Sequence, residues 1–171
     1  MALREDQIQR YSRQILLKEV GGRGQSRLLD TVVTVEGHSQ ALDVAVAALG
    51  ASGTPLVDLA RSERTGFLAG TSLEALCPDA VASPNRPAAG WLGPFSSGVD
   101  APLACFRVGV SPGAIVGVPP HAAWPERLPS GEPAEPVTTG SLAALIVQRF
   151  ALGLEASPVT VRWLGDRWLR D

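Results

Sequence analysis

Lysine and cysteine, which are suited to phosphate chemistry and to nucleophilic or zinc chemistry, are rare in this sequence. Lys18 is the one lysine, so a mechanism that sets a lysine against a triphosphate must use it or take a lysine from a partner. Cys77 and Cys105 are the two cysteines, and they are far apart in the chain and in no paired spacing. A zinc site made of four cysteines within this chain is therefore excluded.

The cysteines and histidines also fit purely structural roles. Cys77 follows one or two predicted helical turns (72–76), a position typical of a small core residue, and a role as nucleophile is the alternative. Cys105 lies in an apolar run (103–106) that would raise the pKa of its thiol. His38 lies in a turn, where histidine usually serves as a hydrogen-bonding residue, and His121 lies in a proline-rich run that predicts exposure.

Length, charge and hydropathy favour one water-exposed globular domain. The chain has 171 residues, 45% of them hydrophobic and 19% charged, with a formal net charge of −2. This balance provides enough apolar material for one core and gives no basic face for nucleic acid. The longest apolar stretch, 140–154, is interrupted by Gln148 and Arg149 and is too short to span a bilayer. The opening MALREDQIQRYSRQ holds no apolar core of a signal peptide, so we expect a cytoplasmic protein.

Hydrophobic periodicity predicts alternating strands and helices. We expect helices over 5–18, 25–29, 40–51 and 138–152, with Gly21 and Gly22 ending the first. We expect strands over 32–35, 56–59, 108–110, 114–118 and 159–164, and a turn at 165–166 leading to 167–169. The residues 83–102 are expected to be loop, and 119–136, with six prolines, to be either ordered coil or flexible. A strand, helix and strand in succession predict a βαβ unit with parallel strands.

The segment 10–28, RYSRQILLKEVGGRGQSRL, resembles the opening of the ThiF/MoeB/HesA superfamily, which includes the ubiquitin-activating enzymes. The run RYSRQ followed by GGxGQxxL is the specific part. Residues 32–35 correspond to the first Rossmann-like strand of that family and 56–58 to the second, which ends in an acidic residue, here Asp58. The run LEALCP (73–78) is similar to the family's leucine-asparagine-proline turn, and 138–153 to a late helix beside its dimer contact.

The resemblance implies an α/β fold with a Rossmann-like, mainly parallel sheet flanked by helices, in a shortened domain. We expect a single domain over 1–171. Its parts are an N-terminal helical dimer arm (1–30), a reduced core (31–118), a proline-rich loop (119–137), and a late helix with C-terminal strands (138–171).

The phosphate loop of the family is degenerate in this sequence. Where the family has GxGGxG, the chain has Glu36, His38, Ser39 and Ala41, with Gly37 between the first two. We expect the Glu36 carboxylate to face the phosphates, at a cost of about 1–4 kcal/mol from like-charge repulsion, and side chains to occupy space that backbone amides need. The alternative is that the residues form a different tight turn.

Other parts of the family's nucleotide site are also missing. The phosphate-contacting lysine has no counterpart, Asp100 is the one candidate for the magnesium-binding turn, and Arg61 or Arg64 could replace the family's arginine. The catalytic cysteine segment and the paired-cysteine zinc motifs are not found. We therefore expect no cofactor and no metal for the chain by itself, with ATP and Mg²⁺ bound only through a partner or if the site is active after all.

The second arginine of RYSRQ, Arg13, corresponds to the residue that in this family reaches the ATP of the neighbouring protomer. A guanidinium there would neutralise phosphate charge as an arginine finger, with Arg10 and Tyr11 supporting the helix. The alternative is that the segment survives only as a packing helix.

Three functions follow as hypotheses. The first is a catalytically degenerate subunit that forms a homodimer, or a heterodimer with a full-length activating enzyme, and lends Arg13 to adenylation of a ubiquitin-like or sulfur-carrier protein or a peptide. The second is a minimal active adenylyltransferase. The third is a non-enzymatic module that binds a peptide or metabolite in the former nucleotide cleft.

Overall fold

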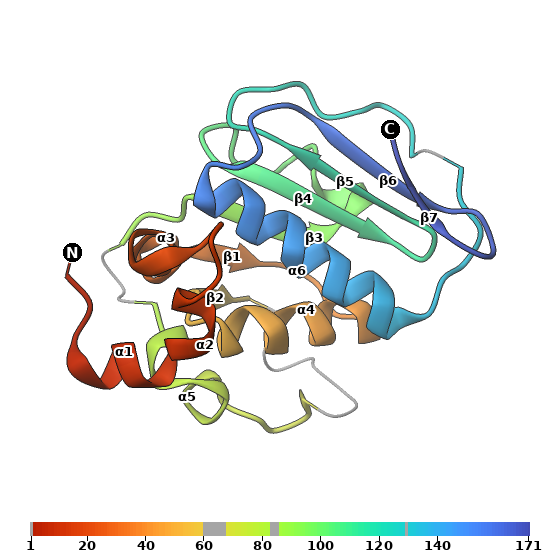
Figure 1. The fold of residues 1–171 in the computed structure, drawn as a ribbon. Coiled ribbons are helices and arrows are strands. Elements are labelled where there is room, and N and C mark those ends of the chain that lie inside the picture. Colours follow the sequence, from red (N-terminus) through yellow and green to blue (C-terminus); the bar gives the residue numbers. More distant parts are fainter. Residues whose placement is uncertain (1, 60–67, 83–85, 129) are drawn as a thin grey trace.

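The computed structural model describes residues 2–59, 68–82, 86–128 and 130–171. Its centre is a seven-stranded sheet in the order β2-β1-β3-β4-β5-β6-β7 (Figure 1). The first four strands in this order pair in parallel, and β5, β6 and β7 extend the sheet by antiparallel pairing. The strands are β1 (Val33–Val35), β2 (Leu56–Asp58), β3 (Gly90–Pro94), β4 (Phe106–Ser111), β5 (Ala114–Val118), β6 (Val159–Trp163) and β7 (Trp168–Arg170). The predicted Rossmann-like α/β fold is confirmed.

Two helices, α4 (Gln40–Ala51) and α6 (Pro136–Leu152), lie side by side over one face of the sheet (Figure 1). Gly140 allows their close approach, because a Cβ at this position would lie 2.2 Å from the carbonyl oxygen of Ala41. Val33 and Val35 of β1 point into the core that these helices cover. Helix α6 begins at Pro136 rather than at 138, since proline is favoured in the first helical turn, and Gly153 in the left-handed region ends it.

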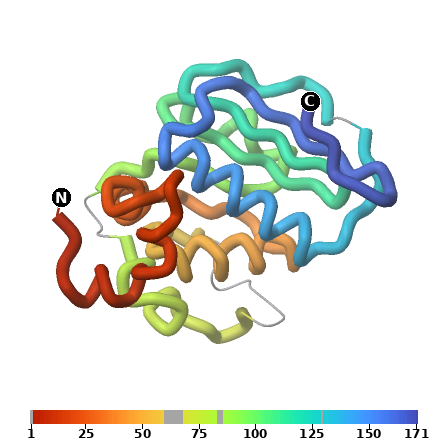
Figure 2. Tube along the Cα trace, viewed as in Figure 1, coloured from red at the N-terminus to blue at the C-terminus, as the bar shows by residue number. Residues whose placement is uncertain are grey.

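The N-terminal region forms three helices, α1 (Glu5–Arg10), α2 (Ser12–Ile15) and α3 (Gly21–Asp30). The prediction of one helix over 5–18 is wrong, because the helix is interrupted at Tyr11. The ring of this residue is buried against the end of α4. Gly21, with φ of +58°, begins α3 instead of ending the first helix. Figure 2 traces the chain from this region to a C-terminus on the opposite side of the molecule.

The region 83–102, expected to be loop, contains β3 and the 3-10 helix η4 (Phe95–Ser97). The strand was hidden because two of its five residues are glycines, which normally mark turns. Both are needed for packing: a Cβ on Gly90 would lie 2.2 Å from the Phe106 ring, and one on Gly93 2.4 Å from the Trp91 ring.

Where the structure describes it, the proline-rich segment (119–136) contains no helix or strand before α6 begins at Pro136. Trp124 packs against Gly98 and Gly109 on the sheet face opposite α4 and α6, and its ring stacks at an angle on Phe95 with centroids 5.3 Å apart. The Arg107 guanidinium lies 5.4 Å from the Trp124 ring and donates to the carbonyl oxygens of Gly98 and Ala122. Loops thus cover the second face of the sheet.

The remaining short helices are α5 (Leu73–Leu76) and the 3-10 helix η3 (Pro78–Ala80), which together form the LEALCP turn. The C-terminal strands form the predicted hairpin, in which Trp163 and Trp168 face each other with ring centroids 5.5 Å apart. In the described part of the chain, none of the helices is long and apolar enough to cross a membrane.

Candidate functional site

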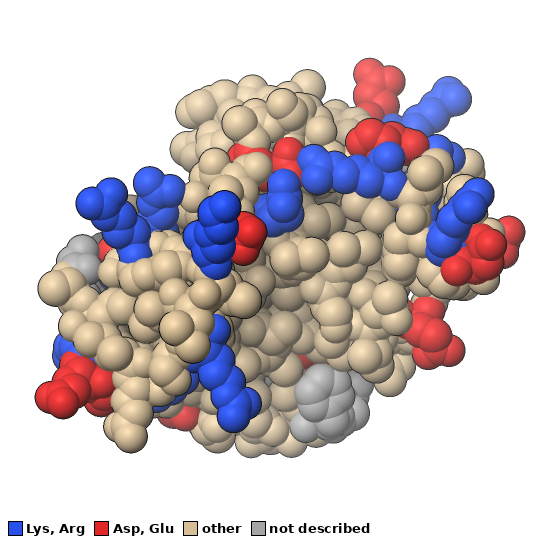
Figure 3. Space-filling view, viewed as in Figure 1, with Lys and Arg blue, Asp and Glu red and all other residues tan. Residues whose placement is uncertain are grey.

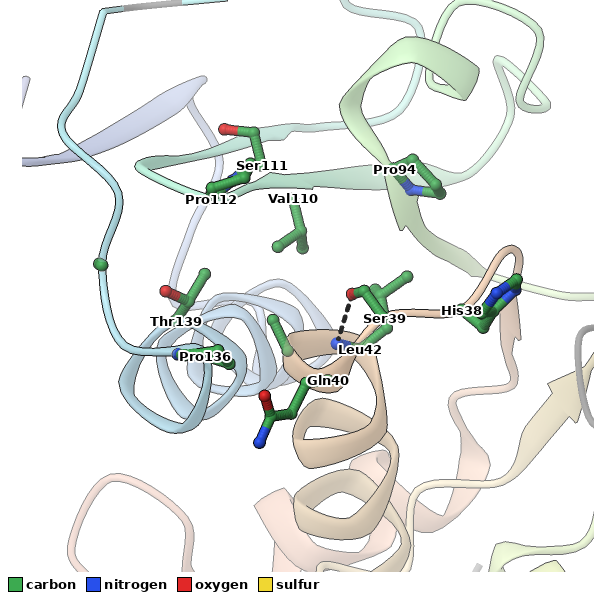
Figure 4. Close-up of a pocket in the computed structure, with 12 residues that line it drawn as sticks. His38, Ser39, Gln40, Leu42, Pro94, Val110, Ser111, Pro112, Pro136 and Thr139 are labelled. Atoms are coloured by element: carbon green, nitrogen blue, oxygen red, sulfur yellow. Dashed lines mark hydrogen bonds between the residues drawn. The ribbon is translucent and has the colours of Figure 1, made fainter. Parts of the chain in front are cut away.

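A cavity of about 260 Å³ opens at the carboxyl ends of β1, β3 and β4, between the beginnings of α4 and α6 (Figure 4). Its walls are mainly apolar and come from His38, Ser39, Gln40, Ala41, Leu42, Pro94, Val110, Ser111, Pro112, Ala134, Pro136 and Thr139. β1 lies between β2 and β3, so the strand order changes direction here. Open α/β sheets bind ligands at the carboxyl ends of their strands at such a point.

The turn from β1 into α4 forms one side of this cavity. Gly37 has a φ of +70°, and a Cβ there would lie 2.8 Å from Cγ of Pro94, so glycine is required. Ser39 begins α4 as its N-cap, and its Oγ accepts a hydrogen bond of 3.2 Å from the amide of Leu42. The structure therefore brings together His38, Ser39 and Ala41, as the sequence predicts, but the serine already occupies one of the amides that a phosphate would need.

Glu36 does not line this cavity, which corrects the expectation that its carboxylate faces the phosphates there. Side chains alternate along a strand, so Thr34 and Glu36 lie on the sheet face opposite Val33 and Val35. The indole N–H of Trp91 donates to Oε2 of Glu36 at 3.0 Å. The repulsion argument therefore does not apply to the cavity at α4.

Glu36 instead lines a second, smaller cavity of about 190 Å³ on the loop-covered face, with Asp100 and Cys105 among its other lining residues. Burial raises the pKa of the Cys105 thiol, as its apolar setting predicts, and its Sγ donates to the carbonyl oxygen of Ala88. Asp100 is exposed and lies in the loop before β4. Within the described ranges, no group of three or more His, Cys, Asp or Glu residues gathers as a metal site.

In the RYSRQ segment, Arg10 and Tyr11 have side-chain partners in the rest of the chain, whereas Arg13 has none among the described residues. Arg10 pairs with Asp79 in η3, and the Tyr11 hydroxyl donates to the same carboxylate at 3.0 Å. Arg13 is exposed on α2, and no hydrogen bond or ion pair joins its side chain to the described residues. Contacts within the chain therefore explain Arg10 and Tyr11 but not Arg13.

Arg13 is also distant from the cavity of its own chain. The arm that carries α2 contacts the carboxyl end of α4, where the Tyr11 ring lies over Gly53, whereas the cavity lies at the other end of this helix (Figure 1). Twelve residues of α-helix extend about 18 Å. An action of Arg13 on a ligand at such a cavity would therefore have to take place in another chain.

Four other residues were singled out in the sequence, and the structure describes two of them. Asp58 ends β2 as expected and is half-buried. Cys77 is buried, and its Sγ lies 3.1 Å from the Tyr11 hydroxyl, in accordance with a core residue. Arg61 and Arg64, the candidates for the family's arginine, lie outside the described residues.

Asp79 is the residue of this region that sequence reasoning missed. It accepts hydrogen bonds from Gln7 at 2.9 Å and Arg4 at 3.3 Å as well as from Tyr11. Burial by itself would raise the pKa of Asp79, but the hydrogen bonds from Gln7, Tyr11 and Arg4 and the charge on Arg10 hold it below its ordinary value. The signal in the sequence was the position of this aspartate, directly after the LEALCP run.

Comparisons with known proteins support the fold alone. No family model and no curated protein matches the sequence. The crystal structure of SeMet PaaA is similar to this chain, with a TM-score of 0.59 and 15% sequence identity. The superposition covers 99% of this chain and 74% of the PaaA chain. At this identity the likeness establishes a shared α/β architecture.

Proposed function

We propose that this chain is a ThiF/MoeB/HesA-like subunit that does not adenylate by itself and acts by binding a second protein chain. The partner is a second copy of this chain or an activating enzyme with a complete nucleotide site. The observation that carries the proposal is the nearly uncharged surface of α4 and α6 (Figure 3).

The composition of these two helices supports an interface. Asp43, which is buried, is the one charged residue of α4, and Arg149 is the one charged residue of α6. Val137 and Leu145 of α6 are about half exposed, at 56% and 50%. In Figure 3 the charged side chains lie mainly around the margins of this face. Water-exposed helices normally carry charge on their outer side, so a face of this kind favours burial against protein.

The N-terminal arm adds further apolar surface and a cation. Leu16, directly after α2, is 84% exposed, and Leu17 is 53% exposed. Arg13 precedes them by one turn and has a side chain without a partner among the described residues. An exposed arginine beside apolar anchors suits an element that reaches a neighbouring chain, and its planar guanidinium suits phosphate or carboxylate there.

Sedimentation equilibrium tests the proposal. We expect the wild-type chain to self-associate at micromolar concentration and Leu145→Glu to weaken this association at least about tenfold, because a carboxylate would be buried in the interface. Leu103→Glu is the matched control, since Leu103 is 59% exposed but lies in the loop before β4. A wild-type chain that stays monomeric, or two variants with equal effects, would contradict the homodimer.

A second function, binding of a small ligand or peptide, is favoured by the cavity at the start of α4. No Asp, Glu, Lys or Arg is among the described residues of its walls, and the beginnings of two helices supply partial positive charge at its mouth. This suits a short apolar group that ends in a carboxylate. Calorimetric titration with N-acetylated tripeptides tests it, and Val110→Trp, which fills the cavity, should abolish any heat that the wild type gives.

A further inference from the structure

Four side chains of the N-terminal arm, defined here as residues 2–17, converge on one carboxylate in the rest of the protein. Asp79 accepts from Gln7 at 2.9 Å, from Tyr11 at 3.0 Å and from Arg4 at 3.3 Å, and it contacts the Arg10 guanidinium. Every one of these donors belongs to the arm, whereas Asp79 belongs to η3 beside the end of α4. The Asp79 side chain is only 10% exposed, whereas its partners Arg4 and Arg10 are 56% and 34% exposed, so the carboxylate is shielded from water although both arginines reach it.

The apolar contacts of the arm centre on one side chain. Helix α2 has no buried residue, and Gln7 is the one buried residue of α1. Tyr11, between these helices, is the arm's fully buried aromatic side chain, with Leu3 and Ile15 partly packed beside it. An element with few buried apolar groups can open locally while the core stays folded.

We propose that Asp79 is a latch, which means that its carboxylate holds the arm closed and that the arm detaches as a unit when the carboxylate is removed. The sheet and the pair α4 and α6 stay folded in the open form, because their core does not include the arm. If the proposed function holds, the latch also determines whether Arg13 is held in a fixed position for a partner.

Hydrogen exchange of the isolated protein tests the latch without requiring a partner. In Asp79→Asn the arm amides (5–15) should exchange at least about tenfold faster than in the wild type, while those of β4 and β5 keep their rates, because hydrogen bonds to a charged acceptor are lost in the arm only. Arg10→Gln removes one donor and should give a smaller increase in the same amides. The control is Asp171→Asn, which removes an ion pair with Arg162 on the C-terminal hairpin and should leave the arm unchanged.

Unchanged arm exchange in Asp79→Asn would overturn the latch, and so would an increase spread equally over arm and sheet. If Asp79→Asn does not fold, Arg10→Gln decides alone: unchanged arm exchange in this variant overturns the proposal. A monomeric wild type would contradict the proposed homodimer but would leave these exchange rates, and the latch, unaffected.

Discussion

The hydroxyl of Tyr11 joins three parts of the chain. It lies 3.1 Å from Sγ of Cys77 and donates to Asp79, while its ring covers Gly53 just after α4. Burial, with these two hydrogen bonds and the neighbouring acidic groups, raises the pKa of Tyr11, so the phenol stays neutral at any ordinary pH. The tyrosine of the RYSRQ segment is therefore a structural residue, which explains its place in the motif without any catalytic role.

Gly53 should be sensitive to the smallest possible substitution. Its φ is +81°, and a Cβ would lie 2.4 Å from the Tyr11 oxygen. We expect Gly53→Ala to lower the free energy of unfolding by roughly 3 kcal/mol, because backbone strain and displacement of a buried ring add together. Gly70→Ala is the matched control: φ is +70°, but nothing lies within 4 Å of its Cβ, so only about 1 kcal/mol should be lost. Urea denaturation of both variants checks this, and equal losses would contradict it.

Asp79 should make stability depend on acid. Its pKa is lower in the folded chain than in the unfolded chain, so the unfolded state binds more protons between these values and stability rises with pH there. At pH 7 we expect Asp79→Asn to be less stable than the wild type by about 2 kcal/mol. As the pH falls below about 4 and through the lowered pKa, the wild type loses this advantage and the two unfolding curves converge. A difference that stays constant from pH 7 to acid would contradict the assignment.

At the scale of elements, the loop-covered face of the sheet takes the place of a helical layer. Arg107 is 1% exposed, and its Nε has no partner among the described residues, although its other nitrogens donate to Gly98 and Ala122. A buried guanidinium that bonds carbonyl oxygens and faces an indole ring holds two loops together. This clamp joins the proline-rich segment, at Ala122, to the loop that follows η4, at Gly98.

Trp124 should be the main anchor of that segment. Its ring fills the space over Gly98 and Gly109, so Trp124→Ala would leave a cavity and cost about 3 kcal/mol of unfolding free energy. Trp124→Phe should cost less, because an aromatic ring remains. Trypsin cleavage after the exposed Arg127 reports the loop directly and should become faster in Trp124→Ala than in Trp124→Phe. Equal cleavage in wild type and Trp124→Ala would show that the loop is held by other contacts.

The elements differ in how well the sequence predicts them. β1, α4 and β2 were predicted within a residue or so, because a β-branched run and an alanine-rich run carry their own periodicity. β3 was missed since Gly90 and Gly93 reflect packing against Phe106 and Trp91, which no local pattern contains. The sequence could place the turn at 37–41 beside a cavity. It could not give the direction of the Glu36 side chain or the convergence of the arm on Asp79, because both depend on contacts between residues distant in sequence.

At the scale of the whole molecule, the two elements that resemble nucleotide-handling parts lie at opposite ends of α4. The turn at 37–41 lines a cavity at the start of this helix, and Arg13 belongs to the arm that packs against its end (Figure 1). Electrostatic stabilisation of a phosphate requires donors within hydrogen-bond distance, which the length of α4, about 18 Å, prevents within one chain. Cooperation of the two parts would therefore require a second chain.

This separation gives a prediction for the isolated chain. With ATP, Mg²⁺ and labelled pyrophosphate, exchange should stay at background, because no lysine or arginine is among the described residues that line the cavity and Ser39 already caps one amide of α4. Arg13→Ala should leave this background unchanged in the isolated chain. If the chain were a minimal adenylyltransferase, exchange would exceed background and Asp58→Ala would abolish it, since the family resemblance places Asp58, at the end of the second strand, in the nucleotide site. The same assay with an added activating enzyme separates the two parts, because a finger acting in the other chain would make exchange depend on Arg13 and not on Asp58.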